Sequence, residues 1–115
     1  MAIDFDESQL DAITGGDPEF EREIIEEYLA SAPRDLQKLK GAVLANDVTA
    51  TGSFAHGLKG ASATIGARGF AAIAFELEQA GKQGDLSRSG ATLDRLERAY
   101  AELAALLRSR VSKAA

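Results

Sequence analysis

The sequence predicts an all-α protein, an antiparallel four-helix bundle with a short N-terminal helix capping one end. No segment alternates apolar and polar residues as a half-buried strand does, and apolar residues instead recur every three or four positions. The breaks between these segments are short, and short loops between long amphipathic helices favour antiparallel neighbours. Together, these two observations indicate a single helical bundle.

The first two predicted helices begin near acidic residues. A short helix covers residues 6–13, and Asp17 followed by Pro18 starts the next, because a capping aspartate before proline is typical of a first turn. We expect helix over 18–45, either as one bent helix or as two nearly collinear ones, since Pro33 must kink or restart it. The buried side chains expected in its first half are Phe20, Ile24, Tyr28 (or Ile25) and Leu29.

Three further helices complete the pattern. Asp47 caps a helix that ends at Gly66, because glycine tolerates the left-handed conformation common at helix ends. The fourth helix covers about 67–82, and the fifth covers roughly 88–112. The apolar residues expected to face inward are Phe70, Ile73, Ala74 and Leu77 in the fourth helix and Leu93, Leu96, Tyr100, Leu103 and Leu107 in the fifth.

Composition limits the possible functions. The 115 residues, 45% of them hydrophobic, suit one domain spanning 1–115. The chain has no cysteine and one histidine, which excludes disulfides, a thiolate nucleophile and a histidine-cluster metal site. No apolar run is long enough to cross a bilayer, and the acidic N-terminus is unlike a secretory signal. We therefore expect a soluble, cytoplasmic protein. We also expect it to be free-standing, since the chain begins with methionine and shows a five-helix pattern, and monomeric, since each apolar stripe has a partner within the bundle.

Charge is distributed unevenly along the chain. Residues 1–47 hold twelve acids and four bases, whereas residues 48–115 hold six acids and nine bases. No cluster of lysine and arginine with interleaved aromatic residues is present, which argues against nucleic-acid binding. The acidic half indicates a solvated helix face, with a docking surface for a basic partner as the alternative.

The single histidine, His56, lies on an unusual helix face. At about 100° per residue, Phe54, Leu58, Ala61 and Ile65 fall on the opposite, core-facing side. An ordinary solvated face would be rich in long polar side chains, but here the neighbours within about 60° of the histidine are nearly all small. These neighbours are Gly52, Ser53, Lys59, Gly60, Ala63 and Ala67.

The chemistry of this face favours a phosphoryl group. A lone histidine is more often an ordinary residue, and a lone lysine a solubilising one, but a neutral imidazole is a good nucleophile near pH 7. Lys59, three residues from His56, is a helical neighbour that would stabilise an anion attached to the ring. No carboxylate lies three or four residues from His56, so no Ser-His-acid arrangement emerges.

The stretch HGLKGASATIGA (56–67) resembles the signature of histidine-containing phosphotransfer (HPt) domains, roughly H-x-L-K-G-x-x-x-x-φ-G. The similarity extends over nearly the whole chain. Residues 16–33 resemble the second helix of the family, and FELE at 75–78 resembles its L-E element. The resemblance therefore implies an HPt-like bundle.

The resemblance also implies a function. Members carry a phosphoryl group between the aspartates of response-regulator receiver domains and have no kinase activity of their own, so whether such a domain counts as an enzyme is open. His56 would be the phospho-acceptor, Lys59 would steady the phosphoryl charge and Gly60 would keep the ring accessible. The expected partners are receiver domains and a hybrid histidine kinase. No cofactor is expected, because Mg²⁺ belongs to the receiver.

Two features depart from the family pattern. Gly57 stands where many members have a residue that favours helix, and it lies about 100° away from the histidine. The histidine helix also lacks a nearby acid, which is unlike the HPt modules of chemotaxis kinases, where an acid orients the histidine. We therefore expect the relay type of domain. We also expect docking through Gly52, Ser53, Ala63 and Ala67.

Two alternatives to the relay remain. One is a non-catalytic helical adaptor that binds a receiver or kinase partner through the small-residue face. The other is the dimerisation module of a sensor kinase, in which an acid typically follows the histidine. Gly57 at that position argues against the second alternative, and the presence of both His56 and Lys59 argues against the first.

Overall fold

The computed structural model describes residues 4–114, and within that range every regular element is an α-helix. The helices are α1 (Glu7–Thr14), α2 (Pro18–Leu44), α3 (Val48–Thr64), α4 (Arg68–Gln83) and α5 (Ser89–Ala114). All five predicted helices are present, with ends shifted by one or two residues. Pro33 lies inside α2, which continues through it as one helix. The predicted fold class is therefore confirmed.

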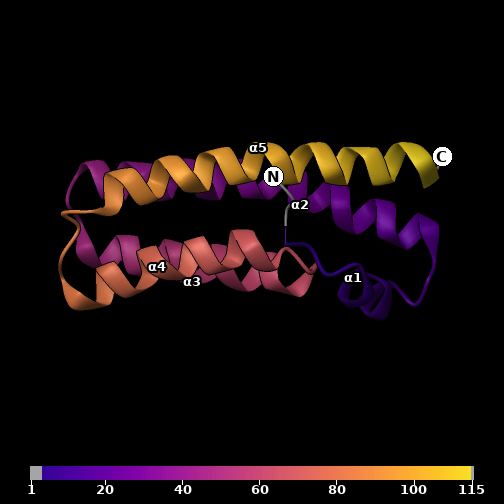
Figure 1. The fold of residues 1–115 in the computed structure, drawn as a ribbon, viewed down its shortest axis with the longest axis horizontal. Coiled ribbons are helices and arrows are strands. Elements are labelled where there is room, and N and C mark those ends of the chain that lie inside the picture. The colour runs from indigo at the N-terminus through magenta and orange to yellow at the C-terminus, as the bar shows by residue number, and fades with distance from the viewer. Residues whose placement is uncertain (1–3, 115) are drawn as a thin grey trace.

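Helices α2 to α5 form a closed bundle (Figure 1). Helix α2 packs against α3 and α5, and α4 packs against the same two helices from the other side. Since α2 and α5 have 27 and 26 residues while α3 and α4 have 17 and 16, the longer pair extends beyond the shorter pair. Helix α1 lies beside this overhang, so it caps one end of the bundle as expected (Figure 1).

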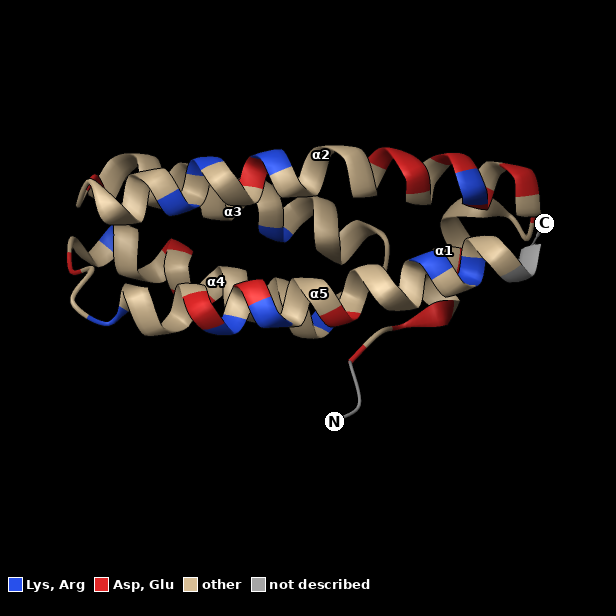
Figure 2. Ribbon diagram, turned by 90° about the horizontal axis from the view of Figure 1, so that it is seen from above, with Lys and Arg blue, Asp and Glu red and all other residues tan. Residues whose placement is uncertain are grey.

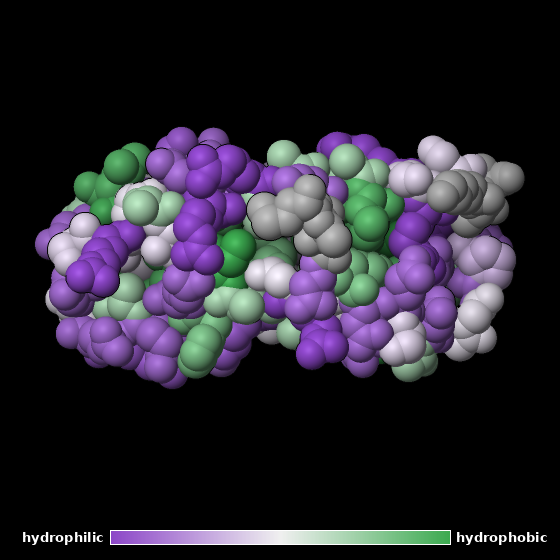
Figure 3. Space-filling view, viewed as in Figure 1, coloured by the Kyte–Doolittle hydropathy of each residue, from purple (hydrophilic) through white to green (hydrophobic). Residues whose placement is uncertain are grey.

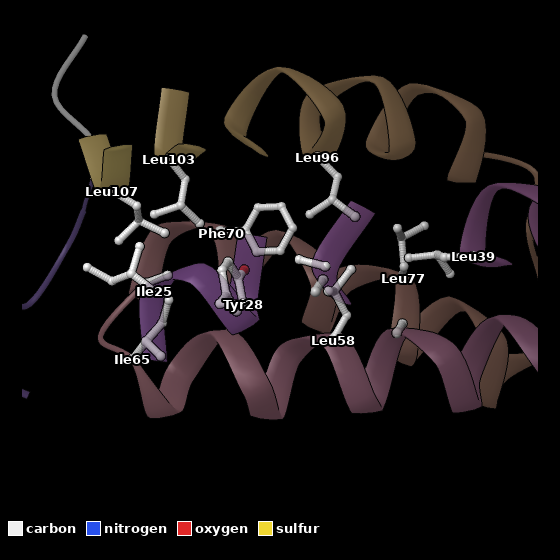
Figure 4. Packing of buried hydrophobic residues seen from close by; sticks show 14 of the residues in the cluster. Ile25, Tyr28, Leu39, Leu58, Ile65, Phe70, Leu77, Leu96, Leu103 and Leu107 are labelled. Carbon is white, nitrogen blue, oxygen red and sulfur yellow. The ribbon is translucent and has the colours of Figure 1, made fainter. Parts of the chain in front are cut away.

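The core runs along the axis of the bundle, and its side chains project into the space between the helices (Figure 4). The predicted stripes of α4 and α5 supply much of it, with Phe70 packed edge-on against Tyr100 at 5.9 Å between ring centroids. The expectation for Phe20 was wrong, since this side chain is 44% exposed. It lies in the first turn of α2, whereas the packed positions of this helix begin at Ile24 and Ile25. None of the described helices combines the length and apolarity needed to span a membrane.

An arginine near the end of α5 ties the capping helix to the bundle. The Arg110 guanidinium contacts Glu7 of α1 at 2.7 Å and Glu21 of α2 at 2.9 Å. Asp11 of α1 lies 3.6 Å from the same group. Part of the acidic N-terminal half, which Figure 2 shows along α1 and the start of α2, is thus neutralised within the fold.

The N-terminal segment also clasps the turn between α3 and α4. The Asp6 amide donates to the Gly66 carbonyl at 2.7 Å, and the Gly69 amide donates to the Asp4 carbonyl at 2.9 Å. Gly66 has φ +93°, the left-handed conformation predicted at the end of this helix. A Cβ atom at Gly66 would overlap the Asp6 carbonyl oxygen, so both backbone conformation and close approach require glycine there.

Gly66→Ala is expected to lower the free energy of unfolding by about 3 kcal/mol or more, since it combines a left-handed alanine with a steric overlap. Gly84→Ala is the matched control, because Gly84 has φ +70° but open space around its Cβ position. That variant should cost only about 1 to 2 kcal/mol, the conformational part alone. Urea denaturation measures both, and equal losses would contradict the proposed role of the N-terminal clasp.

Candidate functional site

His56 lies on the outer face of α3 with its side chain 69% exposed. The buried residues of this helix lie on the other side: Thr51, Ala55, Leu58 and Ser62. The predicted orientation of His56 is therefore confirmed, but the prediction that Phe54 and Ala61 face the core was wrong, since both are exposed. The buried residues of α3 face α2 and α4. The stripe that they form is rotated about the helix axis away from Phe54 and Ala61, so these two residues lie at its edge.

A buried hydrogen bond fixes the rotation of α3 against α2. The hydroxyl groups of Tyr28 and Ser62 lie 2.6 Å apart, and both residues are buried. Burial raises the pKa of Tyr28 above its ordinary value, so its hydroxyl stays protonated. Since Ser62 is six residues from His56 on the opposite face, this contact directs the histidine outward.

The imidazole is held by a carboxylate from the neighbouring helix. Glu78 of α4 has a side chain only 2% exposed, and its Oε2 lies 3.1 Å from His56 Nδ1. Two lysines neutralise the same carboxylate: Lys59 Nζ lies 2.7 Å from Oε1, and Lys82 Nζ lies 3.0 Å from Oε2. A buried carboxylate is costly unless it is paired, and here two ammonium groups and the imidazole contact it.

The charge state of Glu78 determines which nitrogen of the ring can react. Contact with the Lys59 ammonium above all, and then with Lys82 and His56, holds the pKa of Glu78 at about 2 against the opposing effect of burial. An ionised carboxylate only accepts hydrogen bonds, so Nδ1 of His56 must carry the proton and donate it. The lone pair of the neutral ring then lies on Nε2, which makes this nitrogen the nucleophile.

Two glycines bring α3 and α4 close enough for this contact. A Cβ at Gly81 would lie 2.6 Å from the backbone nitrogen of Gly52 and 2.7 Å from the carbonyl oxygen of Val48. Gly81 therefore cannot be substituted without separating the helices one turn away from Glu78. Gly52, predicted as a docking residue, is half-buried against this crossing, although it also borders the groove described below.

A groove of about 580 Å³ lies beside the imidazole between α3 and α4. His56, Glu78 and Lys82 line it together with Ser53. On the other side of Glu78, the Lys59 ammonium lies 5.0 Å from the centroid of the half-exposed Phe75 ring. Lys59 of α3 and Lys82 of α4 thus both contact the carboxylate that holds the imidazole, and α3 itself contains no Asp or Glu.

The remaining predicted site residues divide into exposed and buried. Gly60, Ser53 and Ala63 are exposed, and a Cβ at Gly60 would meet nothing within 4 Å. The docking prediction for Ala67 was wrong, because this residue is fully buried. The chain leaves the helix at the left-handed Gly66, so the periodicity of α3 does not extend to Ala67, which precedes the first residue of α4. Gly57 is exposed with open space around it, and nothing in the structure explains it.

Sequence reasoning missed Glu78 and Lys82 as site residues. The histidine helix has no acid near His56, as expected, but an acid of α4 contacts the ring, so the lack of an acid on that helix no longer favours the relay type of domain. The sequence did contain a signal for Glu78. It is four residues after Ala74 and three before Gly81, and residues at these spacings share one face of a helix, so a carboxylate lies beside the apolar stripe of α4. An acid at such a position needs a cationic partner.

Glu78 is expected to make the free energy of unfolding fall as the solution becomes acidic. Its pKa in the folded state, about 2, is below the ordinary value of 4.5, so its contribution is present above about pH 4.5 and is lost as the pH falls towards 2. The difference in unfolding free energy between wild type and Glu78→Gln should therefore be largest near neutral pH and shrink towards pH 2.5. Urea denaturation at several pH values measures it. Glu27→Gln, which removes an exposed carboxylate, is the control, and a difference for Glu78→Gln that stays constant with pH would contradict the assignment.

Comparisons with known proteins bear directly on this arrangement. Residues 23–106 match the Hpt domain family. No curated protein matches the chain. Among solved structures, the chain is similar to histidine-containing phosphotransfer protein B (HptB) from Pseudomonas aeruginosa PAO1, with 25% sequence identity, a TM-score of 0.91 and 98% of each chain covered. The chain therefore belongs to the Hpt domain family, whose members transfer phosphoryl groups on histidine in two-component phosphorelays.

Proposed function

We propose that His56 is the residue that carries the phosphoryl group, receiving it from the aspartate of one receiver domain and passing it to another. The observation that carries this proposal is the hydrogen bond from His56 Nδ1 to the buried, ionised Glu78. It fixes the tautomer whose free lone pair is on Nε2, and it does so on a side chain that is 69% exposed. A nucleophile that is both oriented and exposed suits transfer between proteins.

The transfer step follows from this arrangement. The Nε2 lone pair attacks phosphorus, the bond from phosphorus to the aspartyl oxygen breaks, and the aspartate leaves as a carboxylate. The ring gains positive charge as the N–P bond forms, and the hydrogen bond to the ionised Glu78 carboxylate then also joins two opposite charges, which strengthens it. Lys59 stabilises the phosphoryl oxygens electrostatically. The reverse step returns the group to a receiver through the same contacts.

Hpt domains interact with kinases and response regulators in these relays. For this chain we propose docking of receiver domains on the exposed face of α3, through Ser53, Gly60 and Ala63 with Gly52 at its border. This face lacks acids and is flanked by Lys59, so it complements an acidic receiver site. The Mg²⁺ that such a site holds would stay on the receiver, and a hybrid histidine kinase would supply the phosphoryl group.

We also propose that the protein acts as a cytoplasmic monomer. The apolar stripes of α2 to α5 pack against one another, and the face shown in Figure 3 carries apolar residues only in small patches among hydrophilic ones. A non-catalytic adaptor remains the second candidate. The three polar contacts that satisfy Glu78 at the imidazole favour the relay, because an adaptor has no need of an oriented histidine.

His56→Gln should abolish phosphoryl acceptance, because glutamine has no nucleophilic ring nitrogen. The assay incubates the protein with a panel of purified receiver domains carrying labelled aspartyl phosphate. Wild type should acquire phosphate that is labile in acid and stable in alkali, and the variant should acquire none while keeping its helical circular dichroism. Equal labelling of both proteins would reject His56, and failure of wild type with every receiver would reject the relay.

Gly60→Gln should slow transfer by at least about tenfold, equivalent to about 1.4 kcal/mol in the barrier, because a side chain one turn from His56 would obstruct the approaching receiver. Helicity should stay the same or improve, since glycine is a poor helix former. Gly41→Gln is the matched control, because Gly41 is also an exposed glycine inside a helix with open space at its Cβ position. Rapid-quench kinetics measure the rates, and unchanged kinetics of Gly60→Gln would reject the access argument.

A further inference from the structure

Lys82 belongs to the histidine site without being part of the HPt signature motif. Its Nζ lies 3.0 Å from Glu78 Oε2, and His56 Nδ1 lies 3.1 Å from the same oxygen. The ammonium and the ring nitrogen are therefore separated by at most about 6 Å, and both side chains line one groove. Lys82 is 65% exposed, so its flexible stem can redirect the ammonium without disturbing the core.

The charges of the cluster leave Lys82 available for a second contact. Glu78 carries one negative charge, and Lys59, only 28% exposed, contacts its other oxygen at 2.7 Å. One lysine is enough to neutralise one carboxylate. A phosphoryl group on Nε2 would bring about two negative charges close to the same carboxylate. Repulsion between these anions would oppose phosphorylation unless a further cation stands between them.

We propose that Lys82 is a second cationic partner of the phosphoryl group. When His56 is phosphorylated, the Lys82 ammonium moves away from Glu78 and contacts the phosphoryl oxygens. This inference rests on His56 as the phospho-acceptor and assigns a further residue to that site. The Lys82 ammonium then stabilises the phosphorylated state directly, while Lys59 and the Nδ1 proton of His56 continue to satisfy Glu78. Loss of Lys82 should therefore disfavour the phosphohistidine relative to the aspartyl phosphate of a receiver.

The test uses phosphoramidate as a chemical donor, so that it does not depend on a receiver. The imidazole Nε2 displaces ammonia from phosphoramidate and forms the N–P bond. The ³¹P NMR shift of the phosphohistidine is then titrated from pH 5 to 9. Lys82→Met should raise the midpoint of the titration by about 0.5 pH unit, because a nearby cation favours the dianionic phosphoryl group. Lys82→Arg should restore it.

Two controls separate this role from others. Lys40→Met also removes one positive charge, but Lys40 pairs with Glu97 between α2 and α5, and the midpoint should not move. In a Glu78→Gln background Lys82 has no carboxylate to neutralise, and Lys82→Met should still raise the midpoint if it contacts the phosphoryl group. An effect that vanishes in this background would mean that Lys82 acts only through Glu78, which would overturn the proposal, as would an unchanged midpoint.

Receiver assays distinguish failure of this inference from failure of the relay. In equilibrium with a phosphorylated receiver, Lys82→Met should hold about threefold less phosphohistidine than wild type. If wild type is labelled by phosphoramidate but by no receiver, the relay fails while the titration still tests Lys82. If neither donor yields a phosphohistidine signal, both proposals fail.

Discussion

The buried carboxylate of Glu78 is the constraint on which the site depends. A side chain only 2% exposed must satisfy its charge within the fold, and it does so through one residue of its own helix and two from α3. These contacts require that α3 and α4 lie close together, which the Gly81 backbone permits against Gly52. They also require a fixed rotation of α3, to which the buried Tyr28–Ser62 contact contributes. The helix contacts that form the bundle are thus the same ones that orient the histidine.

Small residues have two different roles in this chain, which the sequence alone does not separate. At Gly66 and Gly81 the packing inside the protein requires glycine, because a Cβ at either position would overlap backbone atoms of a neighbouring segment. Gly60 has open space around it, so no internal contact requires glycine there. Gly52 and Ala67 were assigned to the exposed histidine face with Gly60, yet one borders a helix crossing and the other is buried. A helical wheel gives direction but not the position of the neighbouring helix.

The fold was largely predictable because its signals are local. Caps such as Asp17 and Asp47 and the left-handed Gly66 mark helix ends within a few residues, and the apolar stripes identify the inner faces. The outward direction of His56 followed from the same periodicity. The orienting acid could not be found in this way, because Glu78 is 22 residues away on another helix. His56 and Glu78 become neighbours only because α3 packs on α4. The resemblance of FELE (75–78) to the family's L-E element included Glu78 but did not indicate that it contacts the histidine.

An acid beside a phosphoryl acceptor has two opposing effects, and the lysines resolve the conflict. The carboxylate stabilises the positive charge that the ring gains when Nε2 is phosphorylated, but it also repels the incoming phosphoryl group. If a neutral group instead of Glu78 accepted the hydrogen bond from Nδ1, the repulsion of the phosphoryl group would be absent, but the positive charge of the ring would not be stabilised. Because Lys59 holds one oxygen of Glu78, the carboxylate keeps its hydrogen bond to His56 while its charge is offset. The net charge of the group formed by Glu78, Lys59 and Lys82 is then positive before transfer, which favours an arriving anion.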